Sequence, residues 1–288
     1  MGRFIFVLSL ILFGHSGTAA AQDIAWDRVL GASPGKLTAA QKSRATEALR
    51  TIHNYYGCSR TVADCLKTDP KCETARRVAG FIVRLAAFDR SVAEMRAAVL
   101  ERSRSVHPLK PKTLSTTADH CVGNPAAAKV TVVVFADVLC PFCAQIVPLL
   151  HRLVTARGAS FALCFKHFPT TAHEQLGVRA SEAVTAAARQ GKGWEYLLAA
   201  YPQRRSINEG RLLELARSLK LDPVRFQKDW SSRPVKRFVA QDKREGLALG
   251  IVGTPTLYVN GKQWLGRQDE AELADRLDEE LMLGNGGK

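Results

Sequence analysis

Residues 129–143 read KVTVVVFADVLCPFC, a β-branched apolar run that leads into two cysteines separated by two residues. The run 129–135 predicts a strand buried on both faces, as parallel strands of α/β sheets usually are. Residues 144–156 are mostly helix formers with Pro148 among them, so the cysteine pair is expected to open a helix. The sequence therefore predicts a CxxC pair at a strand-to-helix junction.

A CxxC pair at a helix start is suited to redox chemistry, because the helix dipole and free N–H groups favour an anion at the first sulfur. Zinc sites use the same spacing, but zinc normally requires a second pair or histidines at suitable spacing, and none lies nearby. An inert disulfide staple would not require such a junction. We therefore expect a redox dithiol, with Cys140 as the nucleophile, Cys143 as the resolving sulfur, and no metal or other cofactor at this site.

The residues after the CxxC helix predict an α/β domain with a long helical block. A second strand is expected at 160–168, and the Asn260-Gly261 turn predicts a hairpin, since Asn-Gly is the strongest two-residue hairpin signal. Asp269 and Glu272 cap a last helix that runs to about residue 283. The helical block, about 173–249, is expected to contain helices at 173–190, 193–201, 206–219 and 223–249.

The residues before the α/β domain predict a small all-α domain at 22–104. About four helices are expected between residues 38 and 103, and capping boxes pair Thr38 with Gln41 and Ser91 with Glu94. Residues 105–120 have two prolines and no hydrophobic periodicity, so a linker is expected there, with the domain boundary near 105–115. The α/β domain is then 121–284, followed by the tail 285–288.

The first 21 residues indicate export, because Arg3 precedes a short apolar run and residues 19–21 are all alanine. We expect a signal peptide at 1–21, cleaved after Ala21, and a mature chain that is soluble in the periplasm or secreted. The composition, 46% hydrophobic and 24% charged over 288 residues, is that of a globular protein. The net charge of +14 is interpreted as a solvated basic surface, and no nucleic-acid partner is expected.

From about residue 121 to 284, the sequence resembles the DsbA-like thioredoxin-fold thiol-disulfide oxidoreductases. The matching motifs, in order, are Gly123-Asn124-Pro125, Phe135-Ala136-Asp137, Cys140-Pro141-Phe142-Cys143, Phe165-Lys166-His167-Phe168-Pro169, Gln190-Gly191-Lys192 with Trp194, Gly253-Thr254-Pro255-Thr256 and Val259-Asn260-Gly261. The resemblance implies a thioredoxin-like fold with a helical insertion and a cis peptide at Thr254–Pro255 packed against the dithiol. It also implies that the backbone at Thr254 pairs with an extended substrate chain.

The resemblance implies disulfide exchange with protein thiols in the bacterial cell envelope, and we expect a disulfide oxidase. Isomerase or reductase activity would use the same residues, and a peptide- or metal-binding module without turnover is a further alternative. The expected partners are unfolded or reduced exported proteins and a membrane redox partner for recycling. The role of the N-terminal domain, homodimer formation included, stays open.

Two positions depart from the family pattern. Phe142 stands where the strongest family oxidants carry His, so we expect a less depressed pKa at Cys140 and a milder oxidant than those enzymes. Val134 stands where relatives often place a buried acid that assists proton transfer, and Asp137 is the nearest carboxylate in sequence. Asp137 is interpreted first as a strand-end or loop residue, and His167 and His173 as hydrogen-bonded structural residues that could flank the cleft.

Five of the seven cysteines lie outside the CxxC pair. Cys58, Cys65 and Cys72 are seven residues apart, which on one continuous helix is about 10.5 Å and beyond disulfide reach. Because Asp69-Pro70 breaks the helical path, we favour a disulfide within this trio without a choice of pair, with a metal site as the alternative. In the thioredoxin sheet that the resemblance implies, Cys121 and Cys164 could lie side by side as a second pair.

Overall fold

The computed structural model describes residues 24–284, which form two compact units divided between Ala97 and Ala98. The expected signal peptide, 1–21, and the expected tail, 285–288, lie outside the described residues. The division lies within α4 (Val92–Val106), before the expected boundary at 105–115. None of the helices within residues 24–284 is long and apolar enough to cross a membrane.

The expected linker at 105–120 is part of the second unit, which corrects the predicted division. Ser105 donates a hydrogen bond to the carbonyl of Gln263 at 2.8 Å, and the Lys112 N–H donates to the carbonyl of Gly261 at 2.7 Å. The Ser115 N–H donates to the Glu245 carboxylate at 3.0 Å. Between α4, which ends at Val106, and η3, which begins at Ala118, residues 107–117 form no helix or strand, and the backbone N–H groups of Lys112 and Ser115 are satisfied by these contacts.

The first unit is helical and its expected caps are present. Thr38 and Gln41 form a capping box. Ser91 and Glu94 form a second one, in which the side chain of each residue accepts the backbone N–H of the other. The third helix begins after Cys72, and it buries most of its residues against the first two. The helices are α1 (Ala39–Thr51), α2 (Val62–Thr68), α3 (Glu73–Ala87) and the beginning of α4, preceded by the short turns η1 (Trp26–Arg28) and η2 (Pro34–Lys36).

The second unit is built on one mixed five-stranded sheet with the order β1-β3-β2-β4-β5. The central strand β2 pairs in parallel with β3 and antiparallel with β4, and Val134 lies opposite Phe165 and Leu257. The short turn η3 (Ala118–His120) precedes the first strand and η4 (Gly158–Ser160) precedes the third. The strands are β1 (Cys121–Val122), β2 (Val130–Ala136), β3 (Phe161–His167), β4 (Thr256–Val259) and β5 (Lys262–Gln263).

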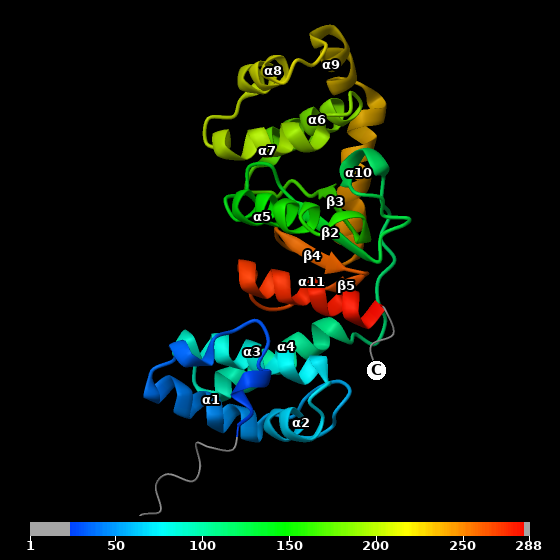
Figure 1. Ribbon diagram of the computed structural model, residues 1–288. Helices are drawn as coiled ribbons and strands as arrows, with labels where there is room; N and C mark the ends of the chain where they lie inside the picture. Colours follow the sequence, from blue (N-terminus) through cyan, green and yellow to red (C-terminus); the bar gives the residue numbers. More distant parts are fainter. Residues whose placement is uncertain (1–23, 285–288) are drawn as a thin grey trace, which may run out of the picture. The chain divides into compact units, whose positions relative to one another are not determined.

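Both faces of the sheet are covered, which explains the continuous apolar run of β2. Val132 and Val134 face one core, which includes residues of α5 (Cys143–Thr155) and α11 (Glu270–Gly284), whereas Phe135 faces the other. On that second face, α10 (Arg233–Ala248) packs on β3, and a Cβ at Gly246 would lie 2.6 Å from the Phe168 ring. Figure 1 shows α5 and α11 running across the sheet and α10 beside it. The thioredoxin-like fold is confirmed.

The helical insertion lies between β3 and β4 as expected, although its helices differ from the prediction. The predicted helix 223–249 is two helices, because Ser232 caps a new start by accepting the Val235 N–H, and a proline stands in its first turn. The predicted start at Ser206 is instead at Asn208, whose side chain accepts the Arg211 N–H. The insertion contains α6 (Glu174–Ala188), α7 (Gly193–Gln203), α8 (Glu209–Ser218), α9 (Pro223–Trp230) and α10; Figure 1 shows the first four at one end of the unit and α10 running back beside the sheet.

His120 is a buried neutral histidine in the second unit. Its ring stacks on Phe238 with centroids 4.4 Å apart, and neither ring nitrogen has a hydrogen-bond partner among the described residues. Burial, helped by the nearby His167 and Lys166, lowers the pKa of His120 from 6.5 to about 3, although Asp242 and Asp119 oppose this. Because the folded pKa lies below the unfolded one, the neutral ring contributes stability above about pH 6.5, which is lost as the pH falls towards 3.

We expect His120→Phe to remove part of this acid sensitivity. At pH 4, about 2.5 units below the unfolded pKa, the neutral aromatic ring should raise the free energy of unfolding relative to wild type by about 2–3 kcal/mol. At pH 7 the two proteins should differ by less than about 1 kcal/mol. Urea unfolding at both pH values measures the difference, with His53→Gln at an exposed histidine as the control. An equal loss of stability in wild type and His120→Phe between pH 7 and pH 4 would contradict the account.

Candidate active site

The CxxC pair stands where β2 passes into α5, as the sequence predicts. Strand β2 ends at Ala136, and the Cys140 N–H donates to the carbonyl of Asp137 at 3.2 Å. The carbonyl of Cys140 accepts the Ala144 N–H at 3.1 Å, so Cys140 stands in the turn that leads into α5, which begins at Cys143. Pro141 is exposed, and Phe142 is 65% exposed with its ring available to solvent.

The two sulfurs have different surroundings. Both cysteines are free thiols in this structure, Cys143 is fully buried, and Cys140 lies nearer the surface. When protonated, the Cys140 thiol donates a hydrogen bond to the carbonyl of Thr254, 3.5 Å from its Sγ. The Thr254–Pro255 peptide is cis, so the structure brings together the dithiol and the loop that the resemblance implies.

The pKa values of the two thiols are moved in opposite directions. A hydrogen bond from the Cys143 thiol lowers the pKa of Cys140 to about 5, helped by the N–H groups of Cys143 and Phe142 and opposed by burial. Burial, followed by the hydrogen bond to Cys140, raises the pKa of Cys143. At neutral pH, Cys140 is therefore a thiolate and Cys143 a protonated thiol.

The Phe142 side chain adds no charge or polar donor to this pair. A Cys140 pKa of about 5 lies above the roughly 3.5 of the most acidic CxxC enzymes, in the direction expected from Phe142.

We expect the reduced protein to show a thiolate titration near pH 5, followed by absorbance at 240 nm. The signal should disappear in Cys140→Ser and persist in Cys72→Ser. Because the folded pKa lies below 9.0, the ordinary value for a thiol, the reduced fold gains stability above pH 9.0 and loses it as the pH falls through about 5. A midpoint at pH 8 or above would contradict this assignment.

Asp137 holds the loop between β2 and the dithiol. Its Oδ1 accepts the Leu139 N–H at 2.9 Å, and its Oδ2 accepts the Thr170 N–H at 2.8 Å and the Thr170 hydroxyl at 3.0 Å. The His173 Nδ1 lies 2.7 Å from the same Oδ2. The carboxylate is fully buried, and it joins the β2–α5 loop to the segment between β3 and α6. Asp137 is therefore a positioning residue, in keeping with its interpretation as a loop residue.

His167 and Val134 lie away from this cluster. His167 is fully buried, its Nε2 is 2.9 Å from the Thr185 hydroxyl, and burial lowers its pKa to about 3. Val134 belongs to the apolar core beneath the active-site helix. Of the two histidines considered from the sequence, only His173 reaches the loop that carries the dithiol.

Tyr201 is a neighbour of the site that the sequence did not indicate. It lies in α7, and its buried hydroxyl has no hydrogen-bond partner among the described residues. Burial raises its pKa, and negative charge at Asp137 and Cys140 raises it further. Within one helix its spacing is that of an ordinary core aromatic, so no local signal marks it.

Two disulfides lie outside the dithiol. Cys121 is joined to Cys164, its register partner across β1 and β3, with Cα atoms 4.0 Å apart. Cys58 is joined to Cys65, which selects one pair of the trio and leaves Cys72 as a buried free thiol. Among residues 24–284, no group of three or more His, Cys, Asp or Glu side chains is placed to hold a metal ion.

Known proteins with similar sequences match about half of this chain. The chain is 34% identical over 145 residues to the Na(+)/H(+) antiporter NhaA 3 of Salinispora tropica, which covers 50% of the chain and 22% of that protein. It is 32% identical over 151 residues to the antiporter NhaA of Herminiimonas arsenicoxydans, covering 52% and 24%. The chain thus spans less than a quarter of the length of these relatives.

Solved structures share the fold of the second unit. Alpha-DsbA1 of Wolbachia pipientis superimposes with a TM-score of 0.51 at 17% identity, covering 60% of this chain and 96% of that one. The thiol-disulfide exchange protein alpha-DsbA2 of the same organism gives 0.50 at 17% identity, covering 64% and 94%. The family model described as thioredoxin matches residues 115–279, more than half of the chain. With this match and the DsbA-like fold around a CxxC pair, the chain belongs to the thioredoxin family.

Proposed function

We propose that the chain is an exported thiol-disulfide oxidoreductase that works as a disulfide oxidase through Cys140-Pro141-Phe142-Cys143. The observation that carries the proposal is the difference in pKa between the two thiols, which is lowered at Cys140 and raised at Cys143. A pKa of about 5 at Cys140 stabilises the reduced enzyme, and this drives electrons from substrate thiols to the enzyme disulfide. The reaction requires no cofactor beyond the dithiol itself.

The proposed reaction transfers one disulfide. A substrate thiolate attacks the Cys140 sulfur of the oxidised enzyme, a mixed disulfide forms, and Cys143 leaves and takes up a proton. A second substrate thiolate attacks the substrate sulfur of the mixed disulfide, and Cys140 leaves as a thiolate. The substrate dithiol is thereby oxidised by two electrons and the enzyme disulfide is reduced. Because its pKa is low, Cys140 leaves more readily in the second step than a thiolate of ordinary pKa would.

The surroundings of Cys140 favour the binding of an unfolded, extended protein substrate. The Thr254 backbone lies 3.5 Å from the Cys140 sulfur, where an added peptide strand would place its own cysteine. Phe142 and Val252, from the two segments that meet there, are 65% and 99% exposed. Exposed apolar side chains of this kind bind apolar residues that a folded protein would bury.

The proposal places the protein in the bacterial periplasm or outside the cell, where disulfides form. Its partners are reduced exported proteins and a membrane redox partner that reoxidises the dithiol. Isomerase or reductase activity would use the same two cysteines in the other direction, so the direction of transfer is the property to measure.

A peptide with two cysteines between a fluorophore and a quencher tests the direction. We expect the oxidised enzyme to convert about one equivalent of reduced peptide to its disulfide form within minutes, in the absence of another oxidant. The reduced enzyme should reduce insulin disulfides slowly with dithiothreitol. Rapid insulin reduction without peptide oxidation would favour the reductase, and neither activity would favour a binding module.

A further inference from the structure

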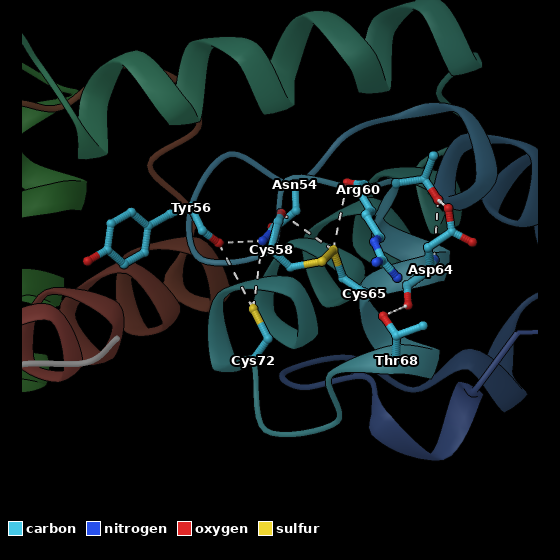
Figure 2. Close-up of a disulfide and its surroundings, with 9 residues drawn as sticks. Asn54, Tyr56, Cys58, Arg60, Asp64, Cys65, Thr68 and Cys72 are labelled. Carbon is cyan, nitrogen blue, oxygen red and sulfur yellow. Dashed lines mark hydrogen bonds between the residues drawn. A yellow bond between two sulfur atoms is a disulfide. The ribbon is translucent and has the colours of Figure 1, made fainter.

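The first unit places a third sulfur beside the Cys58–Cys65 disulfide. Cys65 and Cys72 are buried together, and Cys58 packs against them from a half-buried position. Figure 2 shows the Cys72 sulfur pointing towards the disulfide and the Tyr56 carbonyl. Because the three sulfurs lie in one cluster, thiol–disulfide exchange among them is geometrically possible.

Close packing keeps the Cys72 sulfur beside the chain that leads to Cys58. Gly57 has a φ of +81°, and a Cβ built there would lie 3.3 Å from the Cys72 Sγ. The sulfur therefore rests against the residue that precedes Cys58. Cys72 itself is the N-cap of α3, while Cys65 lies in α2, so three segments present their cysteines to one point.

The surroundings of Cys72 are polar, unlike those of an inert core cysteine. The Asn54 Nδ2 donates to the Cys72 sulfur at 3.8 Å, and the Cys72 thiol donates to the carbonyl of Tyr56 at 4.0 Å. Asn54 is only 6% exposed, and its Oδ1 is buried without a hydrogen-bond partner among the described residues. Asn54 therefore offers the cluster an amide N–H that can donate to a thiolate and an amide oxygen that can accept from a thiol.

The two disulfides that Cys65 can form within the trio close loops of equal length. Cys58 and Cys65 are seven residues apart, and so are Cys65 and Cys72 (72 − 65 = 7). The cost in chain entropy of closing either loop is therefore the same, and loop length does not favour one bond over the other.

We propose that Cys58, Cys65 and Cys72 form a second thiol–disulfide exchange site, separate from the dithiol at Cys140. The Cys72 thiol loses its proton to solvent and attacks the Cys65 sulfur. A Cys65–Cys72 bond forms as the Cys58–Cys65 bond breaks, and Cys58 leaves as a thiolate that takes up a proton. The exchange is an isomerisation without net oxidation, and it replaces a buried free thiol by a half-buried one at Cys58.

The isomerised form presents a thiol to partners. Gly57 and Ser59, the neighbours of Cys58, are exposed, so a protein disulfide can reach its sulfur. The Cys58 thiolate would attack that disulfide, form a mixed disulfide with one partner sulfur and release the other as a thiol. The ligand class of this site is therefore a disulfide on another protein, and the inference holds whether or not Cys140 acts as an oxidase.

Disulfide mapping of the full mature chain tests the proposal. Cys140→Ser/Cys143→Ser is used so that the active dithiol takes no part. The protein is held at pH 8, alkylated with N-ethylmaleimide while folded, and digested at acidic pH for mass spectrometry. We expect molecules with alkylated Cys58 and a Cys65–Cys72 linkage, growing with time. A map that contains only the Cys58–Cys65 linkage, with Cys72 alkylated or unmodified, would overturn the proposal.

Cys72→Ser in the same background is the matched control. Alkylation of Cys58 in the folded protein should be at least tenfold slower without the attacking thiol, and Cys72→Ala provides a second variant if serine prevents folding. Equal alkylation of Cys58 with and without Cys72 would overturn the proposal, because Cys58 would then be released without exchange.

Discussion

Replacing Cys140 by serine is expected to lower the rate of disulfide exchange about 1,000-fold or more. The hydroxyl of serine is neither ionised at neutral pH nor able to form a disulfide, so both half-reactions lose their reacting atom. Insulin reduction and oxidation of the two-cysteine peptide measure the loss. Circular dichroism should show an unchanged fold, because serine is close to cysteine in size and its hydroxyl can keep the hydrogen bond to the Thr254 carbonyl.

Cys143→Ser is the matched control and separates the two roles. This variant keeps the nucleophilic Cys140 but lacks the resolving sulfur, so mixed disulfides with clients should accumulate. Non-reducing gels followed by mass spectrometry would identify the trapped proteins and their bond to Cys140. Retained turnover in Cys140→Ser would contradict the account, and trapping in Cys140→Ser but not in Cys143→Ser would reverse the assigned roles.

Arg102→Met is expected to lower the free energy of unfolding of the second unit by about 3–5 kcal/mol. The guanidinium is 2% exposed and donates to Glu272 and Asp275 at 2.8 Å and to Glu279 at 2.9 Å. Methionine fills a similar volume but removes the charge that these three buried carboxylates share. Their desolvation is then compensated less, although Arg276 still lies 3.4 Å from Glu279, and this cost is larger than the loss of a surface ion pair.

Guanidinium chloride unfolding at pH 7 measures the change, followed by tryptophan fluorescence with the disulfides intact. Arg152→Met is the matched control, because its ion pair with Glu270 has side chains that are 63% and 65% exposed and a separation of 3.6 Å. That variant should change stability by less than about 1 kcal/mol. Equal effects of the two substitutions would contradict the role assigned to the buried cluster.

The features that the sequence predicts are those encoded within a few neighbouring residues. The apolar run of β2, the CxxC pair at the start of α5 and the Asn260-Gly261 hairpin each depend on local pattern, and each is present. The predicted helix bounds are wrong where a helix-forming pattern also contains the start signal of a second helix. The helical residues 223–249 contain Pro234, and the Ser232 cap uses it in the first turn of a new helix.

The contacts that stabilise the second unit and hold the active-site loop join residues far apart in the sequence. Arg102 meets Glu279 from 177 residues away, and Asp137 meets His173 from 36 residues away, so spacing carries no sign of either contact. The same limit applies to the trio, where equal spacings left the choice of pair open. It applies also to residues 105–120, whose composition is that of a linker although the folded sheet binds them.

A glutathione redox titration of the protein tests the central claim most directly. Thiols are alkylated at each potential and the peptides that contain Cys140 and Cys143 are quantified by mass spectrometry. The account predicts a single two-electron transition of this pair, absent in Cys140→Ser, with a potential closer to about −120 mV than to about −270 mV. A potential near about −270 mV would contradict the oxidase, and the absence of any transition at these two cysteines would contradict the redox site itself.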